Sequence, residues 1–149
     1  MKQVIQSRRT GKLALNEVPA PVVKAGHLLV ETRASLISVG TERMAIEFAK
    51  QGLIGKARAR PDLVKQVIEK VNRDGFRKTF ETVMARLYEP LPLGYSASGV
   101  VKAVGVGLEG NFHVGKRVAI AGAGIANHAE FNVVPRNLVA SIPEGVSND

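Results

Sequence analysis

Cysteine and tryptophan are absent from this chain of 149 residues. Without cysteine no disulfide can form and no thiolate can bind a metal, so a metal site would depend on histidine and carboxylate side chains. The three histidines, His27, His113 and His128, have no neighbours at the spacing typical of metal ligands. We therefore expect no metal site, and we expect His128 to pack against its neighbours or to contact solvent.

Long apolar runs and aromatic side chains are also scarce. The sequence has no run of about 18 apolar residues that could span a membrane, and no segment resembles a signal peptide, so we expect a cytoplasmic protein. Aromatic residues make up 5% of the chain, which is few for a protein that stacks nucleic-acid bases. The length predicts roughly one domain with one core, which leaves no room for a complete two-domain enzyme.

Positive charge is concentrated in one segment. The formal net charge is +8, and residues 43 to 87 contain 11 basic and 5 acidic residues, a net charge of +6. Such a segment could attract phosphates, acidic sugars or nucleic acid. Basic side chains on solvated helix faces are the more common explanation, and the composition leaves both explanations open.

The hydrophobic pattern changes twice along the chain. Residues 2 to 40 and the residues after Pro90 alternate or run apolar at strand length, whereas residues 41 to 87 repeat at helical spacing. In this segment we expect helix caps at Thr41 and Asp62 and helix ends at Gly52 and Gly75. The stripes expected to be buried contain Val64, Val67, Ile68 and Val71, then Phe76, Phe80, Val83, Met84 and Leu87. The pattern predicts a mainly β fold, a partly open β-barrel, with a helical insert at residues 43 to 87.

The stretch KRVAIAGAGIAN, residues 116 to 127, begins like a dinucleotide-binding turn. A Rossmann fingerprint needs a third Gly or Ala at the sixth position, followed by a helix. Asn127 stands at that position, and the residues after it alternate like a strand. We therefore interpret Gly122 and Gly124 as a tight turn between two antiparallel strands.

Two stretches outside the insert resemble the GroES-like catalytic domain of medium-chain dehydrogenases and reductases. VPAPVVKAGHLLVETRASLISVGTE is similar to its first half, where a P-x-P-x-x-G-x-V-x-V run leads to a catalytic loop. GYSASGVVKAVGVGLEGNFHVGKRVAIAGAGIANHAEFNVVPRNL is similar to its second half, with G-x-V-x-x-V-G, G-x-R-V and G-G-x-A-E-Y strands in that order. The resemblance covers about two thirds of the chain and implies one GroES-like domain over residues 1 to 149.

The resemblance also shows where this chain departs from the family. The cysteine ligand of the family's catalytic zinc falls on Val39, and the following His and Glu positions fall on Tyr95 and Ser96. Valine has no donor atom for a metal, and too few residues are present for the lobe that holds a structural zinc. The resemblance therefore implies no zinc, as in the zinc-independent branches, and it extends particularly to two-part oxidoreductases associated with polysaccharide synthesis.

Four residues are catalytic candidates on this resemblance. Without zinc, hydrogen-bond donors must stabilise the oxygen that becomes negative. Thr41 matches a catalytic hydroxyl position, with helix capping as its alternative, and Glu42 matches an Asp, with a structural ion pair to Arg43 as its alternative. Tyr95 could donate a proton to substrate or be an ordinary strand aromatic, and Ser96 is a weaker candidate of the same kind.

The family's activity implies hydride transfer between NAD or NADP and the alcohol or carbonyl group of a small-molecule substrate. In the family a downstream Rossmann domain binds the cofactor, and this chain stops where the linker to that domain would begin. We therefore expect a piece of a longer protein that does not turn over alone.

The insert carries the candidate substrate-binding residues Arg43, Lys56, Arg58 and Arg60. We expect its helices to cap the active-site cleft and to meet an anionic substrate such as a nucleotide sugar or acidic glycan. Their alternative role is to cover barrel surface or a homo-oligomer interface. A non-catalytic binding or assembly module, holding a protein or nucleic acid on the basic helices, is a second class of function that the sequence leaves open.

Overall fold

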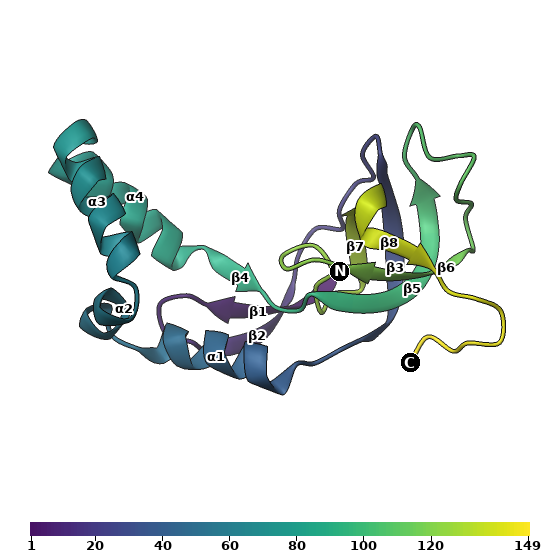
Figure 1. Cartoon of the computed structure of the whole chain (residues 1–149), viewed down its shortest axis with the longest axis horizontal. Coiled ribbons are helices and arrows are strands. Elements are labelled where there is room, and N and C mark those ends of the chain that lie inside the picture. Colours follow the sequence, from purple (N-terminus) through teal and green to yellow (C-terminus); the bar gives the residue numbers. More distant parts are fainter. The chain divides into compact units, whose positions relative to one another are not determined.

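The computed structural model describes the backbone of all 149 residues and every side chain except those of Ala45, Leu53 and Lys56. The chain divides into two compact units. One contains Met1–Ile5, Ala14–Ser38 and Pro92–Asp149, and we call it the sheet unit. The other contains Gln6–Leu13 and Val39–Leu91, and we call it the helical unit. Figure 1 labels the strands and helices from which they are built.

The sheet unit is built on five antiparallel strands in the order β7-β3-β5-β6-β8. Their bounds are His27–Ser35 for β3, Ser96–Val104 for β5, Arg117–Ala121 for β6, Phe131–Pro135 for β7 and Val139–Ser141 for β8. A 3-10 turn, Arg136–Leu138, joins the last two. A second sheet has the order β2-β1-β4, with β1 at Lys2–Ser7, β2 at Leu13–Glu17 and β4 at Pro90–Pro92.

Alternating burial along the strands produces the core of the sheet unit. In β6, in β7 and over the first six residues of β5, every second residue is buried, as expected when one face of a sheet covers a core. Register shifts in β3, which mark bulges or irregularities, favour bending of the sheet. Figure 1 shows the strands curling into a partly open barrel, so the predicted mainly β fold is confirmed. The core residues are Leu28, Val30, Ala97, Val101, Leu108, Phe112, Val118, Ile120, Ala126, Val134 and Val139.

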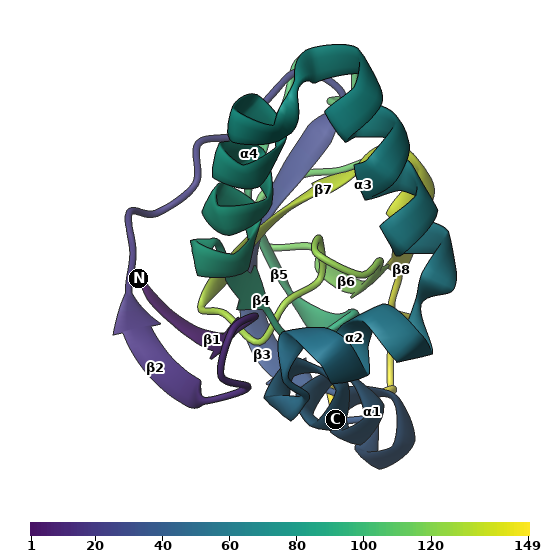
Figure 2. The same cartoon turned by 90° about the vertical axis from the view of Figure 1, so that its left-hand side faces the viewer.

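The helical unit contains four helices: α1 at Val39–Lys50, α2 at Leu53–Ala59, α3 at Pro61–Asp74 and α4 at Phe76–Tyr88. The three predicted helical stretches are confirmed, whereas α2 was not predicted. Gly75 ends α3 with φ 85°, and α3 and α4 diverge from this corner (Figure 2). Among the described residues, no helix is both long and apolar enough to cross a membrane.

The two predicted helix caps are wrong. Helix α1 begins at Val39, which makes Thr41 its third residue, and α3 begins at Pro61 after Arg60. The fixed φ of proline suits the first helical position, so the helix starts one residue before Asp62. The carboxylate of Asp62 nevertheless lies in the first turn of α3, where it complements the helix dipole.

The prediction that the apolar stripe of α3 is buried is also wrong. All residues of α3 are described, and none of them is buried; Ile68 is 54% exposed. In α4 only Thr79 is buried, and Phe80 is 54% exposed. Because the two helices diverge from Gly75, the pair leaves most of its apolar surface uncovered within the helical unit.

Gly122 and Gly124 form a turn that no helix follows, so the rejection of a Rossmann fingerprint is confirmed. The strands on either side of it, however, are not hairpin partners, because β3 and β5 lie between β6 and β7. The prediction of a tight turn between two antiparallel strands is therefore wrong, because the whole of residues 122 to 130 separates β6 from β7. Residues 122 to 130 instead form a crossing segment that runs from one side of the sheet to its far edge.

Gly99 allows the backbones of β3 and β5 to approach closely. A Cβ atom at Gly99 would lie 2.1 Å from the carbonyl oxygen of Glu31, a contact that requires backbone movement. We expect Gly99→Ala to lower the free energy of unfolding by about 1–3 kcal/mol, the usual cost of overpacking. Gly110→Ala is the matched control, because open space surrounds Gly110. Urea unfolding of both variants measures the difference, and equal stability would show that the approach at Gly99 is not constrained.

Candidate polar site at the start of β5

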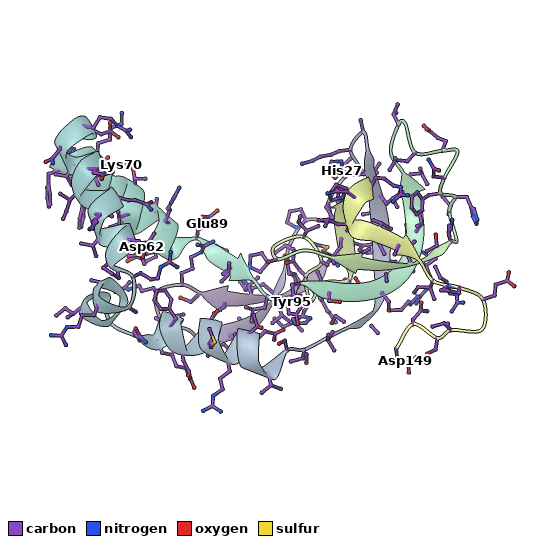
Figure 3. The ribbon with its side chains drawn as sticks, viewed as in Figure 1. His27, Asp62, Lys70, Glu89, Tyr95 and Asp149 are labelled. Atoms are coloured by element: carbon purple, nitrogen blue, oxygen red, sulfur yellow. The ribbon has the colours of Figure 1, made fainter. Side chains whose placement is uncertain are left out.

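Polar side chains gather in the sheet unit where β5 begins. The backbone N–H of Leu36, just after β3, donates to the carbonyl oxygen of Ser96 at 3.0 Å. The N–H of Gly122, in the crossing segment, donates to the carbonyl oxygen of Tyr95 at 2.8 Å. Tyr95 and Ser96 therefore lie between the end of β3 and the crossing segment, and Figure 3 labels Tyr95 at this place. Both side chains are half-buried and keep access to solvent.

Gly94 lets the crossing segment touch the residues that precede β5. Its φ is 102°, and a Cβ atom there would lie 2.6 Å from the backbone nitrogen of His128. His128 N–H donates to the carbonyl oxygen of Leu93 at 2.8 Å, and the N–H of Val4 donates to the carbonyl oxygen of His128 at 2.9 Å. The backbone of His128 is thus held from both sides.

The side chain of His128 meets the end of β3. Its Nδ1 atom lies 2.8 Å from Oγ of Ser35, and the two side chains are half-buried. The expectation that His128 only packs or contacts solvent is therefore incomplete, and Ser35 was not predicted as a site residue at all. No sequence pattern links residues 93 positions apart; only the strand order and the crossing segment bring them together.

Asn132 fixes the crossing segment next to His128. Its Oδ1 accepts a hydrogen bond from the backbone N–H of Asn127 at 3.0 Å, and its Nδ2 donates to the carbonyl oxygen of Asn127 at 3.1 Å. Nδ2 also donates to Oγ1 of Thr32 on β3 at 3.0 Å. Asn132 is 3% exposed, so water competes little with these bonds. Within the described part of the chain, the buried Oδ1 of Asn127 has no hydrogen-bond partner, which leaves one acceptor for a polar ligand or water.

The other predicted site residues belong to the helical unit. Thr41, Glu42 and Arg43 lie in the first turns of α1, and Nε of Arg43 donates to Oε1 of Glu47 at 2.7 Å. This hydrogen bond raises the pKa of Arg43, although the pair is exposed to solvent. Thr41 and Glu42 also make contacts of their own.

One of the basic residues around α2 is already paired with an acidic side chain. Arg60 donates to both carboxylate oxygens of Asp62, with Nη2 to Oδ2 at 2.7 Å, and this pairing lowers the pKa of Asp62. Arg58 is exposed, and the side chain of Lys56 lies outside the described residues. The predicted residues thus divide between the units: Tyr95 and Ser96 in the sheet unit, and Thr41, Glu42, Arg43, Lys56, Arg58 and Arg60 in the helical unit.

The side chains of Val39, Tyr95 and Ser96, which the sequence resemblance aligns with zinc ligands, do not form a zinc ligand set. Val39 ends in methyl groups, and it is 74% exposed at the start of α1. Tyr95 offers a phenol and Ser96 a hydroxyl, whereas zinc sites use thiolates, imidazoles and carboxylates. Among the residues that the structure describes, no three His, Asp or Glu side chains come together where they could hold a metal.

No family model matches this chain, and no curated protein matches it. Solved structures do match. A mycobacterial protein in complex with NADPH is 21% identical with a TM-score of 0.63, over 99% of this chain and 35% of that one. An alcohol dehydrogenase superfamily protein from Novosphingobium aromaticivorans is 22% identical with a TM-score of 0.63, over 99% and 36%. Galactitol-1-phosphate dehydrogenase from Escherichia coli is 18% identical with a TM-score of 0.62, over 99% and 40%.

These likenesses establish the fold. This chain has the GroES-like fold seen in the N-terminal part of medium-chain dehydrogenases and reductases. It spans 35% to 40% of the length of the three solved chains. The GroES-like barrel predicted from the sequence is therefore confirmed, while identities this low do not carry an activity over from those proteins.

Removing the Asn132 side chain is expected to loosen the site. Asn132→Ala would leave the buried backbone N–H of Asn127 without its partner, at a cost of about 1–3 kcal/mol of unfolding free energy, whereas the carbonyl of Asn127 would keep its bond from the N–H of Ala129. Asn137→Ala, on the exposed 3-10 turn, serves as control and should change stability by less than about 0.5 kcal/mol. Chemical denaturation compares the two, and an unchanged midpoint for Asn132→Ala would contradict the anchoring role.

Proposed function

We propose that this chain is the substrate-side domain of a zinc-independent oxidoreductase that transfers a hydride between NAD(P) and an alcohol or carbonyl compound. The observation that carries the proposal is the polar start of β5. In a GroES-like barrel, a phenol and a hydroxyl stand at the two positions that the sequence resemblance aligns with metal ligands of the family's zinc-dependent members. The GroES-like fold and the hydrogen-bonding groups around Tyr95 support it.

The chemistry of carbonyl reduction explains why such groups are needed. Negative charge develops on the substrate oxygen as the hydride adds to carbon, and donors already in place stabilise this charge without reorganising. In this proposal the Tyr95 hydroxyl donates to that oxygen and Ser96 is a second donor. Thr41 and Glu42, in the helical unit, stay catalytic candidates on the sequence resemblance alone. A nicotinamide, when bound, supplies or accepts the hydride.

The cofactor belongs to another part of the protein in this proposal. The glycine turn at Gly122 leads into the crossing segment and not into a helix, so it lacks the helix N-terminus on which a pyrophosphate rests. We infer that residues 1 to 149 form one domain with a helical insert, that a downstream Rossmann domain binds the dinucleotide, and that this chain alone does not turn over. The NADPH held by the mycobacterial relative makes NADP the first cofactor to test.

The helical insert is the part of the proposal that concerns substrate choice. Arg43, Lys56, Arg58 and Arg60 would meet an anionic group, such as the phosphate of a sugar derivative. One relative is named for its action on a phosphorylated sugar alcohol, which supports testing such compounds first. Arg43 and Arg60 already pair with acidic residues of the same helices, so part of their donor capacity is used. Covering barrel surface or an oligomer interface is the competing role of the insert.

Tyr95→Phe tests the donor role in the protein that carries the cofactor domain. Loss of one donor to the oxyanion is expected to lower kcat about 10²-fold or more with a small change in KM. Tyr88→Phe is the matched control, because Tyr88 is exposed on α4 and its hydroxyl accepts from Arg9. Steady-state kinetics measures both variants. A kcat for Tyr95→Phe equal to that of the control would remove Tyr95 from the reaction.

A triple substitution tests the role of the insert. Replacing Lys56, Arg58 and Arg60 with Gln is expected to raise KM for anionic substrates about tenfold, which corresponds to a loss of about 1.4 kcal/mol in binding. Neutral substrates should be unaffected. Replacing Lys65, Lys70 and Lys78 on α3 and α4 removes the same charge and provides the control. If the Lys56, Arg58 and Arg60 variant keeps the KM of the wild type for anionic substrates, these three residues do not bind the anionic group.

A further inference from the structure

We propose that Ser35 and His128 form a proton relay, in which Ser35 gives a proton to the substrate oxygen and His128 replaces it. This inference rests on the proposed function, because it names the proton source for the same reaction. Neither residue stands at a position that the family resemblance marks as catalytic. What the structure adds is a fixed pair of proton-carrying groups at the end of β3, beside the start of β5.

The pair is held in place before any substrate binds. Ser35 is the last residue of β3. The backbone N–H of the next residue, Leu36, donates a hydrogen bond to the carbonyl oxygen of Ser96. The backbone N–H of His128 donates to the carbonyl oxygen of Leu93, and its carbonyl oxygen accepts from the N–H of Val4. The side chain of Asn132 is hydrogen-bonded to the backbone of Asn127, the residue before His128. A donor and acceptor fixed at 2.8 Å meet the distance that proton transfer requires.

The surroundings of the Ser35–His128 pair suit a site that a ligand can reach. Ser35, His128, Tyr95 and Ser96 are all half-buried, so each keeps surface that a substrate can reach. The adjacent Oδ1 of Asn127 is a buried acceptor without a partner in the described part of the chain. A buried, unpaired acceptor of this kind is costly unless something polar occupies the site.

The proton balance of the step is complete. Hydride adds to the carbonyl carbon from a reduced nicotinamide, which is oxidised, and the π electron pair moves to the carbonyl oxygen. The O–H bond of Ser35 breaks and its proton bonds to that oxygen, giving the alcohol. Oγ of Ser35 then takes the proton from Nδ1 of the imidazolium of His128. Neutral His128 regains a proton from solvent before the next turnover.

An imidazole suits this role because each of its two ring nitrogens can carry or release a proton. The titratable side chains on the segments that hold His128 are Lys2 on β1, Tyr95 before β5, Glu130 on the crossing segment, and His27, Glu31 and Arg33 on β3. Of these, Glu31 is paired with Arg33 and with Lys102. His27 is also an imidazole, but it begins β3 whereas Ser35 ends the strand, and its Nδ1 lies 2.8 Å from the carbonyl oxygen of Ala25, so it is not a partner of Ser35.

The first test uses the chain as it is and needs no activity. Long-range 1H–15N NMR of the ¹⁵N-labelled chain reports which nitrogen of each of the three histidines carries a proton. We expect the Nδ1 signal of His128 to show a hydrogen bond and to shift in Ser35→Ala. Ser35→Thr keeps a hydroxyl and should restore the signal. An Nδ1 signal of His128 that is unchanged in Ser35→Ala would overturn the pairing on which the relay depends.

The second test measures kinetics in the protein with its cofactor domain. Ser35→Ala and His128→Gln are expected to lower kcat about 10²-fold with little change in KM, the scale typical of general acid catalysis. His128→Gln should also lose the solvent deuterium isotope effect. Ser35→Thr should recover most of kcat. His113→Gln, in an exposed loop, is the control and should match the wild type.

The outcomes of this second test are distinguishable. If the wild type transfers hydride and both variants keep its kcat and its solvent deuterium isotope effect, the relay is wrong and the proposed function stands. If the wild type transfers no hydride with either nicotinamide cofactor, the proposed function is wrong and the relay is lost with it. Recovery of kcat in Ser35→Thr separates loss of the hydroxyl from damage to the fold.

Discussion

The crossing of residues 122 to 130 over the ends of β3 and β5 is the constraint on which the candidate site depends. β6 and β7 follow one another in sequence but lie apart in the sheet, so the chain must pass across two strands to continue. Gly94 makes the passage possible, because the Cβ atom of any other residue would overlap the backbone of His128. The result is that residues from β3, from the start of β5 and from the crossing segment meet at one end of the sheet.

Polar groups can be buried at this crossing because the backbone is fully bonded around them. Asn132 satisfies both backbone groups of Asn127, and Leu93 and Val4 satisfy those of His128. Each of these bonds contributes modestly on its own, but an unpaired partner would cost more than the bond provides. The same bonds that make the crossing stable therefore restrict the His128 ring to a narrow range of positions, which is the condition for a preorganised polar site.

Elements with strong local patterns could be predicted from the sequence, and contacts across the sheet could not. The alternation in ASGVVKAV and RVAIA is local, and so are the helical stripes of α3 and α4, so these elements were predicted. The start of α3 was missed because Pro61 at the first helical position outweighs Asp62 as a cap. The exposure of Ile68 and Phe80 could not be read from amphipathicity, since periodicity shows which face is apolar but not what covers it. The pairing of Ser35 with His128 depends on strand order, which no local pattern encodes.

The proposed use of hydrogen-bond donors in place of a metal changes what the protein scaffold must provide. A zinc ion fixes the substrate oxygen through a bond of its own and needs only ligands at the right distance. Hydroxyl and imidazole groups are weaker individually, so they act only if several of them are held in place before the substrate arrives. Under the proposal, a valine at the position that the resemblance aligns with a metal ligand is tolerable, whereas a loosely held Tyr95 or His128 would not be. On this reasoning the buried Asn132 and the close approach at Gly94 matter as much to the proposed chemistry as the residues that would touch the substrate.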